Sequence, residues 1–227
     1  MVLRLALLLA LIAPTAAIAH GVAGGDAEFM AATTGVDFWP YVYLGAKHMV
    51  TGYDHLAFLV GVIFFLYGMR HIALYVTLFS IGHSLTLLFG VLSGIHVSAH
   101  LVDAIIGLSV IWKALDNLGA FRTLFGWQPG QKAPVLIFGL FHGFGLATKL
   151  QEVNLSGDGL VANMLAFNIG VELGQILALT LVLALMTLWR ATPSFNRHAM
   201  AANVVLAGVG LVLFQMQMVG FLQEISA

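Results

Sequence analysis

Apolar residues recur along the chain in six long runs, separated by short breaks that contain glycine, proline or charged residues. We place the runs at about 41–67, 72–92, 100–118, 133–151, 160–189 and 199–222. Each run is near the roughly 20 residues that a helix needs to cross a bilayer. The pattern predicts an all-α integral membrane protein, a bundle of about six transmembrane helices, and nothing in it indicates a soluble second domain.

The first 20 residues have a different layout from the six runs. One positive charge, a short apolar core and a break at Pro14 precede Ala17, Ile18 and Ala19. This layout is typical of a secretory signal peptide with an A-x-A cleavage site, and retention as an anchoring helix is the alternative. We therefore expect residues 1–19 to be a cleaved signal peptide and residues 20–227 to be a single polytopic membrane domain. Its mature N-terminus, His20, would then lie on the exported side.

The basic residues in the breaks predict which side of the membrane each break faces. With the mature N-terminus outside, the first, third and fifth breaks are cytoplasmic. These breaks hold Arg70, Arg122, Lys132, Arg190 and Arg197. Only Lys149 lies beside an exported break. The bias satisfies the positive-inside rule and predicts a multi-pass protein of the inner cell membrane.

The overall composition narrows the classes of function. Hydrophobic residues make up 60% of the chain and charged residues only 8%, whereas a soluble domain has about 25% charged residues. The lipid bilayer is thus the main partner of the surface. A net charge of −1 argues against nucleic acid as a partner. The chain has no cysteine, so it has no disulfide, thiolate ligand or cysteine nucleophile.

Histidine and acidic residues interrupt the apolar runs, where an aspartate at the helix centre costs about 2.5–3.5 kcal/mol on insertion scales. Such residues inside a membrane span mark functional sites by default. The metal-ligand candidates are His48, Asp54, His55, His83, His142 and Glu172. Accessory candidates are His20, Ser84, His100, Asp103, Asn168 and Gln175, of which the last two share an i, i+4, i+7 stripe with Glu172.

Spacing limits what the first run can do. His48 and His55 are seven residues apart, which puts them on one helix face about 10 Å apart along the axis. One ion could bridge both rings only with difficulty unless Gly52 bends the helix. Asp54 points about 100° away from His55, toward a neighbouring helix, where it could be a ligand or could orient the imidazole of another span.

The co-occurrence of these residues favours a metal ion over simple packing. A single intramembrane histidine is often only an interhelical hydrogen bond, but four runs carry histidine or an acid at middle depth. No lysine or arginine is expected at that depth to pair with the acids. Buried carboxylates need a counter-charge, and a passing cation would supply it. Imidazole and carboxylate ligands suit divalent nickel, cobalt, zinc or iron better than Cu(I).

The motifs around these residues resemble those of the HupE/UreJ family, and more closely its second branch. They are His48-x5-Asp54-His55, GHSLTL around His83, FGLFHGFGLA around His142 and FNIGVELGQ around Glu172. The resemblance implies a multi-pass nickel permease, or an accessory protein that works with the maturation proteins of nickel hydrogenase and urease. It also implies that the six ligand candidates occupy family motif positions.

Two positions depart from the family pattern. Met49 stands where the hydrogenase/urease branch typically has proline, and Asp103 stands where the second branch usually has glutamate. These departures concern the identity of the ion more than the fold.

Three functions remain open on the sequence. The leading one is transmembrane transport of a divalent metal ion through a path lined by histidine, aspartate and glutamate. In this function the protein is not an enzyme, and it could act as a homo-oligomer. The second is an intramembrane zinc hydrolase, in which three histidines hold the metal and Asp54 acts as general base. The third is a metal-binding accessory subunit that does not transport. The chain has no phosphate-binding loop of the Gly-x4-Gly-Lys-Ser/Thr type, so a nucleotide motor is not indicated.

Overall fold

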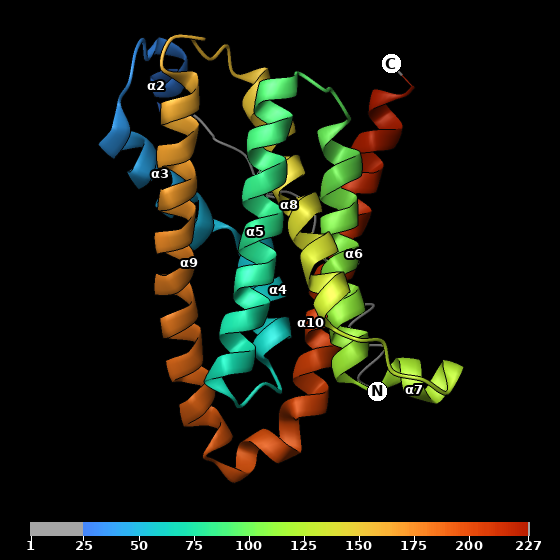
Figure 1. The fold of residues 1–227 in the computed structure, drawn as a ribbon. Helices are drawn as coiled ribbons and strands as arrows, with labels where there is room; N and C mark the ends of the chain where they lie inside the picture. Colours follow the sequence, from blue (N-terminus) through green and yellow to red (C-terminus); the bar gives the residue numbers. More distant parts are fainter. Residues whose placement is uncertain (1–24, 227) are drawn as a thin grey trace.

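The computed structural model describes residues 25–226, which form helices joined by short turns (Figure 1). In chain order the helices are α2 (Gly25–Ala32), α3 (Phe38–Thr51), α4 (Tyr53–Ile63), α5 (Met69–Ser93), α6 (Ala99–Asn117), α7 (Ala120–Phe125), α8 (Lys132–Glu152), α9 (Leu160–Arg190) and α10 (Pro193–Glu224). The all-α prediction is confirmed for this part of the chain. The expected signal peptide and His20 lie outside the described residues.

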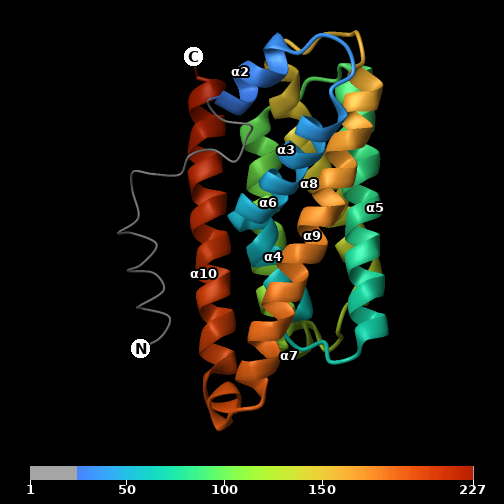
Figure 2. The same cartoon turned by 90° about the vertical axis from the view of Figure 1, so that its left-hand side faces the viewer.

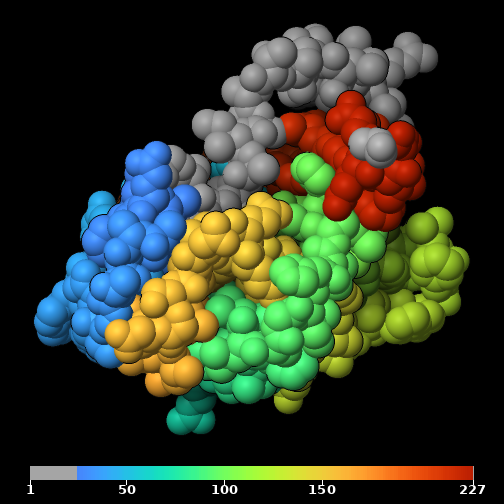
Figure 3. Space-filling view, turned by 90° about the horizontal axis from the view of Figure 1, so that it is seen from above, coloured from blue at the N-terminus to red at the C-terminus, as the bar shows by residue number. Residues whose placement is uncertain are grey.

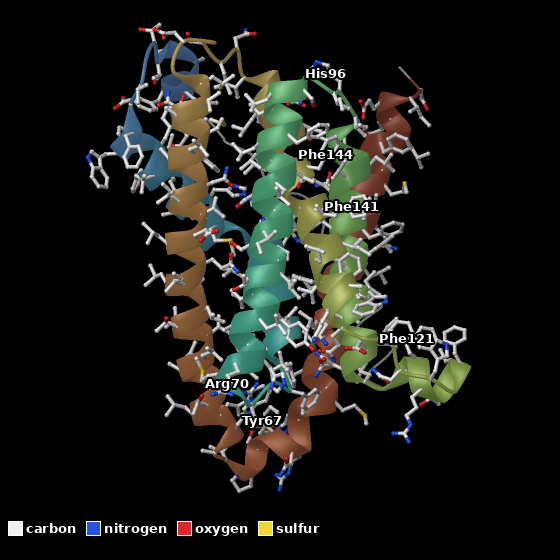
Figure 4. All side chains as sticks on the ribbon, in the orientation of Figure 1. Tyr67, Arg70, His96, Phe121, Phe141 and Phe144 are labelled. Atoms are coloured by element: carbon white, nitrogen blue, oxygen red, sulfur yellow. The ribbon has the colours of Figure 1, made fainter. Side chains whose placement is uncertain are left out.

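The long helices run back and forth between two ends of the molecule, as Figures 1 and 2 show. One end holds the turn at 64–68, α7 and the turn at 191–192, and we call it the basic end. The opposite end, the α2 end, holds α2, the turns at 94–98 and 153–159, and the close of α10. Figure 4 labels Arg70 at the basic end and His96 at the α2 end. The alternation that the charge pattern predicts is therefore present in the fold.

Four of the described helices are long and apolar enough to cross a membrane, judged by length and composition. They are α5, α8, α9 and α10. Helix α6 has 19 residues but carries Asp103, Lys113 and Asp116. The first predicted span is divided into helices of 14 and 11 residues. Four of the six expected spans are thus supported. Of the other two passes, α6 carries three charged residues and the first pass is broken into α3 and α4.

The break in the first pass lies at Gly52. Its backbone is extended, with φ −69° and ψ 91°, so that it ends α3 and begins α4. The amide of Gly52 still donates to the His48 carbonyl at 2.9 Å, and its own carbonyl accepts from Leu56 at 2.8 Å. The prediction of one continuous helix over 41–67 is therefore wrong, and the conditional bend at Gly52 is what the structure has.

Backbone contacts at glycine bring helices together in three pairs, α3 with α9, α5 with α8, and α6 with α10. A Cβ on Gly45 of α3 would lie 2.0 Å from the Phe167 carbonyl oxygen of α9. A Cβ on Gly143 of α8 would lie 2.0 Å from the His83 carbonyl oxygen of α5. Membrane helices use small residues to approach this closely. The contact at Gly143 thus fixes the position of His83 along the axis of α8.

We expect Gly143→Ala to destabilise the protein, because the new methyl group must push the α5 backbone away at His83. Overpacking of this kind costs about 1–3 kcal/mol, and occasionally more. Thermal unfolding of the purified protein in detergent measures it, with Gly130→Ala as control because a Cβ there meets nothing within 4 Å. Equal unfolding temperatures for the two variants would contradict the tight α5–α8 contact.

Arg190 closes the basic end of the first pass. Its guanidinium donates to the carbonyls of Phe64 at 2.7 Å and Leu66 at 3.0 Å, and also to Ile63. The last carbonyls of a helix have no partner within the helix, and a basic side chain near them is favourable. Helix α9 therefore holds the end of α4 in place.

Asn163 of α9 anchors the chain leading into α3 at the α2 end. Its side-chain amide donates to the Gly35 carbonyl at 2.9 Å, and its amide oxygen accepts from the Asp37 backbone at 2.8 Å. In Figure 3, seen from above, the segment before α3 lies directly against the start of α9. Both ends of the α3–α4 pass are thus tied to α9, and the site lies between them.

Candidate metal site

Four histidine rings meet inside the bundle, each from a different helix. They are His48 on α3, His55 on α4, His83 on α5 and His142 on α8. The centre of the His55 ring lies 5.2 Å from that of His48, 5.5 Å from that of His83 and 4.9 Å from that of His142. The break at Gly52 lies between His48 and His55, so the Cα separation of about 10 Å along the axis of a straight helix does not apply to them.

Hydrogen bonds fix which nitrogen of His55 can bind an ion. His55 Nδ1 lies 2.9 Å from Asp54 Oδ1, which also accepts from the His55 backbone amide at 2.8 Å. A carboxylate only accepts, so Nδ1 carries the proton of the neutral ring and Nε2 carries the lone pair. Metal-ligating histidines commonly use a carboxylate in this way. The expectation that Asp54 points about 100° away from His55 is wrong, because its carboxylate bonds to the ring of that adjacent residue on the same helix.

His142 has the same tautomer for a different reason. Its Nδ1 lies 2.8 Å from the Phe138 carbonyl oxygen, one turn earlier on α8. A carbonyl only accepts, so Nδ1 is the donor and Nε2 again carries the lone pair. In two of the four rings, the hydrogen bond at Nδ1 therefore favours the tautomer whose Nε2 can bind a metal ion.

His83 is the least satisfied of the four rings. It is 1% exposed, and within the described residues neither of its ring nitrogens makes a hydrogen bond. Buried polar groups nearly always have a partner, and leaving one without costs about 1–3 kcal/mol. A cation between the rings would give His83 a partner.

The ring separations suit a shared ion, although the rings do not yet converge on one. An imidazole bound to zinc at about 2.1 Å has its ring centre about 3.2 Å from the ion, so two such rings at a tetrahedral angle lie about 5.2 Å apart. The observed rings instead contact edge to face, at 71° to 79°. Among residues 25–226, no three His, Cys, Asp or Glu side chains form a group that could hold a metal as placed. Ring rotation is needed before an ion can be bound.

A layer of phenylalanine rings lies directly below the histidines on the side of the basic end. Each comes one turn from a histidine on the same helix: Phe58 beside His55, Phe79 beside His83 and Phe138 beside His142. The Phe58 ring lies 5.3 Å from Phe79 and 5.7 Å from Phe138. A cavity of about 10 Å³ beside this layer is lined by His55, Tyr75, Gln175 and apolar side chains, and it has room for about one water. This layer closes the bundle toward the basic end.

The polar stripe predicted on α9 divides between two environments. Asn168 and Gln175 are buried and donate to the carbonyls of Met164 and Val76. Glu172 is exposed and accepts a hydrogen bond from Ser80 at 3.1 Å. At about 100° per residue, Glu172 sits about 40° beyond Asn168 and so falls on the edge of the stripe. Gln175 therefore reaches the cavity below His55, and Glu172 lies outside the group of four rings.

The remaining accessory candidates lie at different distances from the rings. Ser84 follows His83, and its buried hydroxyl makes no hydrogen bond within the described residues. His100 lies toward the α2 end, where its Nδ1 is 2.8 Å from Gln217 Oε1. Asp103 forms an ion pair with Lys149 at 2.6 Å.

Lys113 and Lys149 lie inside the bundle and pair with acids of α6, whereas the sequence predicted no lysine or arginine that could pair with the buried acids. Lys149 is turned inward from the end of α8 to Asp103, although it was counted with the exported break. Lys113 and Asp116 form a second pair at 2.6 Å, with side chains 2% and 1% exposed. Spacing of i, i+3 on α6 could have indicated this pair. The acids of α6 thus have counter-charges, and the case for a cation rests on the grouping of the four histidine rings.

The fold and the site together define an all-helical membrane protein with a buried cluster of histidines from four helices. Residues 25–225 match the family model described as HupE / UreJ protein. The chain belongs to the HupE/UreJ family, which is associated with uptake of nickel or cobalt or with an accessory function. No curated protein and no solved structure matches the chain.

Proposed function

We propose that the protein transports a divalent transition-metal ion across the membrane, with nickel favoured and cobalt, zinc or iron as alternatives. The observation that carries the proposal is the contact of His55 with His48, His83 and His142 in the middle of the bundle. Family membership supports a metal-related role. The proposal places the protein in the inner membrane with the α2 end exported and the basic end cytoplasmic, an orientation that the positive-inside rule supports.

In this proposal the imidazoles replace the water around the ion one or two at a time. His55 is the ring common to three contacts, so a small rotation passes the ion from one neighbour to the next. Asp54 compensates part of the positive charge through its hydrogen bond to His55 and keeps that ring in a fixed orientation. Each histidine pair holds the ion less firmly than a complete ligand set, which suits an ion that must be released.

The central experiment measures metal uptake by the purified protein in liposomes, with nickel, cobalt, zinc and iron(II) supplied in turn. Uptake of at least one ion above that of protein-free liposomes is expected. Binding without uptake would favour the accessory subunit and overturn transport. Hydrolysis of a membrane peptide or lipid that depends on the metal would favour the hydrolase instead.

The phenylalanine layer gives a separate prediction. We expect Phe79→Ala to cause leakage of metal from loaded liposomes, because it removes a ring that closes the bundle below His83. Phe89→Ala is the matched control, since Phe89 lies on the same helix and is 58% exposed. Leakage is measured with a metal-sensitive dye outside the liposomes, and equal leakage from both variants would show that the layer is no barrier.

A further inference from the structure

A second small cavity lies beside Asp54, and its lining residues come from α4, α6 and α10. Its lining includes Asp54, Asp103, Leu213 and Gln217, and its volume is about 10 Å³, space for about one water. Two carboxylates from different helices thus face one cavity. Asp54 connects this cavity to the four histidine rings, because its Oδ1 also bonds to the His55 ring.

The ion pair at this cavity is incomplete. Asp103 is 6% exposed, and its Oδ2 lies 2.6 Å from the Lys149 ammonium. Its Oδ1 is buried and makes no hydrogen bond within the described residues. One carboxylate oxygen is therefore compensated by a single positive charge, and the other is left for a further ligand.

Lys149 is suited to leave this position. It lies in the last turn of α8, near the α2 end, on a flexible stem of four carbons that lets its charge reach water. The same helix carries His142, seven residues earlier. A divalent ion attracts a carboxylate about twice as strongly as an ammonium at the same distance.

We propose that this cavity is the first binding site for the divalent cation on its way to the histidines, and that Lys149 is a tethered cation that the ion displaces from Asp103. The inference rests on the proposed transport function. Lys149 then keeps the carboxylate paired while no ion is present. The rival role for the pair is purely structural, a link between α6 and α8.

The first test compares the nickel concentration that gives half-maximal uptake. For Lys149→Gln it should fall about fivefold to tenfold, the range of a moderate coupling between two ligands, because the ion no longer competes with an ammonium. Lys132→Gln is the matched control, because Lys132 begins the same helix at the basic end and is exposed, so its half-maximal concentration should stay at the wild-type value. Asp103→Asn combined with Lys149→Gln should lose the gain, since it removes the carboxylate that both cations use. An unchanged half-maximal concentration in folded Lys149→Gln would overturn the proposal.

The second test needs neither transport nor a Lys149 variant. The chain contains no cysteine, so Leu213→Cys places a single thiol in the cavity wall. The cavity is too small for a membrane-impermeant cationic thiol reagent, and labelling therefore reports its opening. Saturating nickel should slow labelling of Leu213→Cys, whereas labelling of Ile225→Cys, at an exposed position just after the same helix, should not change. Labelling of Leu213→Cys that nickel leaves unchanged would overturn the proposal.

The two tests separate this inference from the transport proposal. Uptake by the wild type with no effect of nickel on labelling leaves transport standing and removes the cavity as a cation site. Nickel-dependent labelling without uptake leaves the cavity standing as a cation site and removes the transport proposal.

Discussion

His55→Ala should abolish metal uptake, lowering the initial rate by at least about 100-fold, the upper range seen when even a supporting residue of a metal site is lost. The structural reason is that His55 is the ring in contact with His48, His83 and His142. Without it, the ion has no ligand that connects the other three. Uptake into liposomes at a limiting metal concentration measures the effect.

A second variant separates the loss of the ligand from the loss of packing. His55→Phe keeps an aromatic ring next to Phe79, which lies 6.2 Å from the His55 ring, but it has no nitrogen. It should unfold at a temperature near that of the wild type and still fail to transport. His198→Ala is the matched control. His198 is exposed on α10 and, within the described residues, hydrogen-bonds to Ser194. Normal uptake by His55→Phe would remove the histidine cluster from the path.

Asp54→Asn should reduce uptake by about 10-fold to 100-fold while leaving the fold intact. The asparagine oxygen can still accept from the His55 amide and from Nδ1, so ring orientation is preserved. What is lost is the negative charge that compensates the cation beside a buried imidazole. The loss should raise the metal concentration needed for half-maximal uptake more than it lowers the maximal rate.

The opposite pattern would identify Asp54 as a structural residue. A lower unfolding temperature together with normal uptake at limiting metal would mean that the carboxylate only fixes the start of α4. Thermal unfolding and uptake measured on the same preparation distinguish the two roles.

Much of the site could be predicted from sequence because its parts recur within apolar runs. A histidine in a membrane-spanning helix is costly wherever it faces lipid, so His83 and His142 had to point inward. The helical class follows equally from the apolar runs. What spacing could not give is the relative placement of rings from different helices, which depends on close contacts such as that between Gly143 and the His83 carbonyl.

The errors have local causes. Gly52 breaks the first pass through a single extended residue, which no apolar periodicity reveals. The direction of Asp54 followed from an ideal helix, yet a side chain in the first turn can bond to the next residue along. Lys149 lies at a helix end, where a long side chain can turn toward water or toward the core, and only the position of Asp103 on the neighbouring helix decides between them.

The most direct test of the central claim is where the protein holds the ion. Crystals soaked in nickel and measured at the nickel absorption edge should give an anomalous peak among His48, His55, His83 and His142, with the His55 Nε2 atom at about 2.1 Å. The rings should be turned from their edge-to-face arrangement toward that peak. Peaks confined to exposed histidines such as His71, His96 and His198, with none beside His55, would contradict a metal path through the cluster.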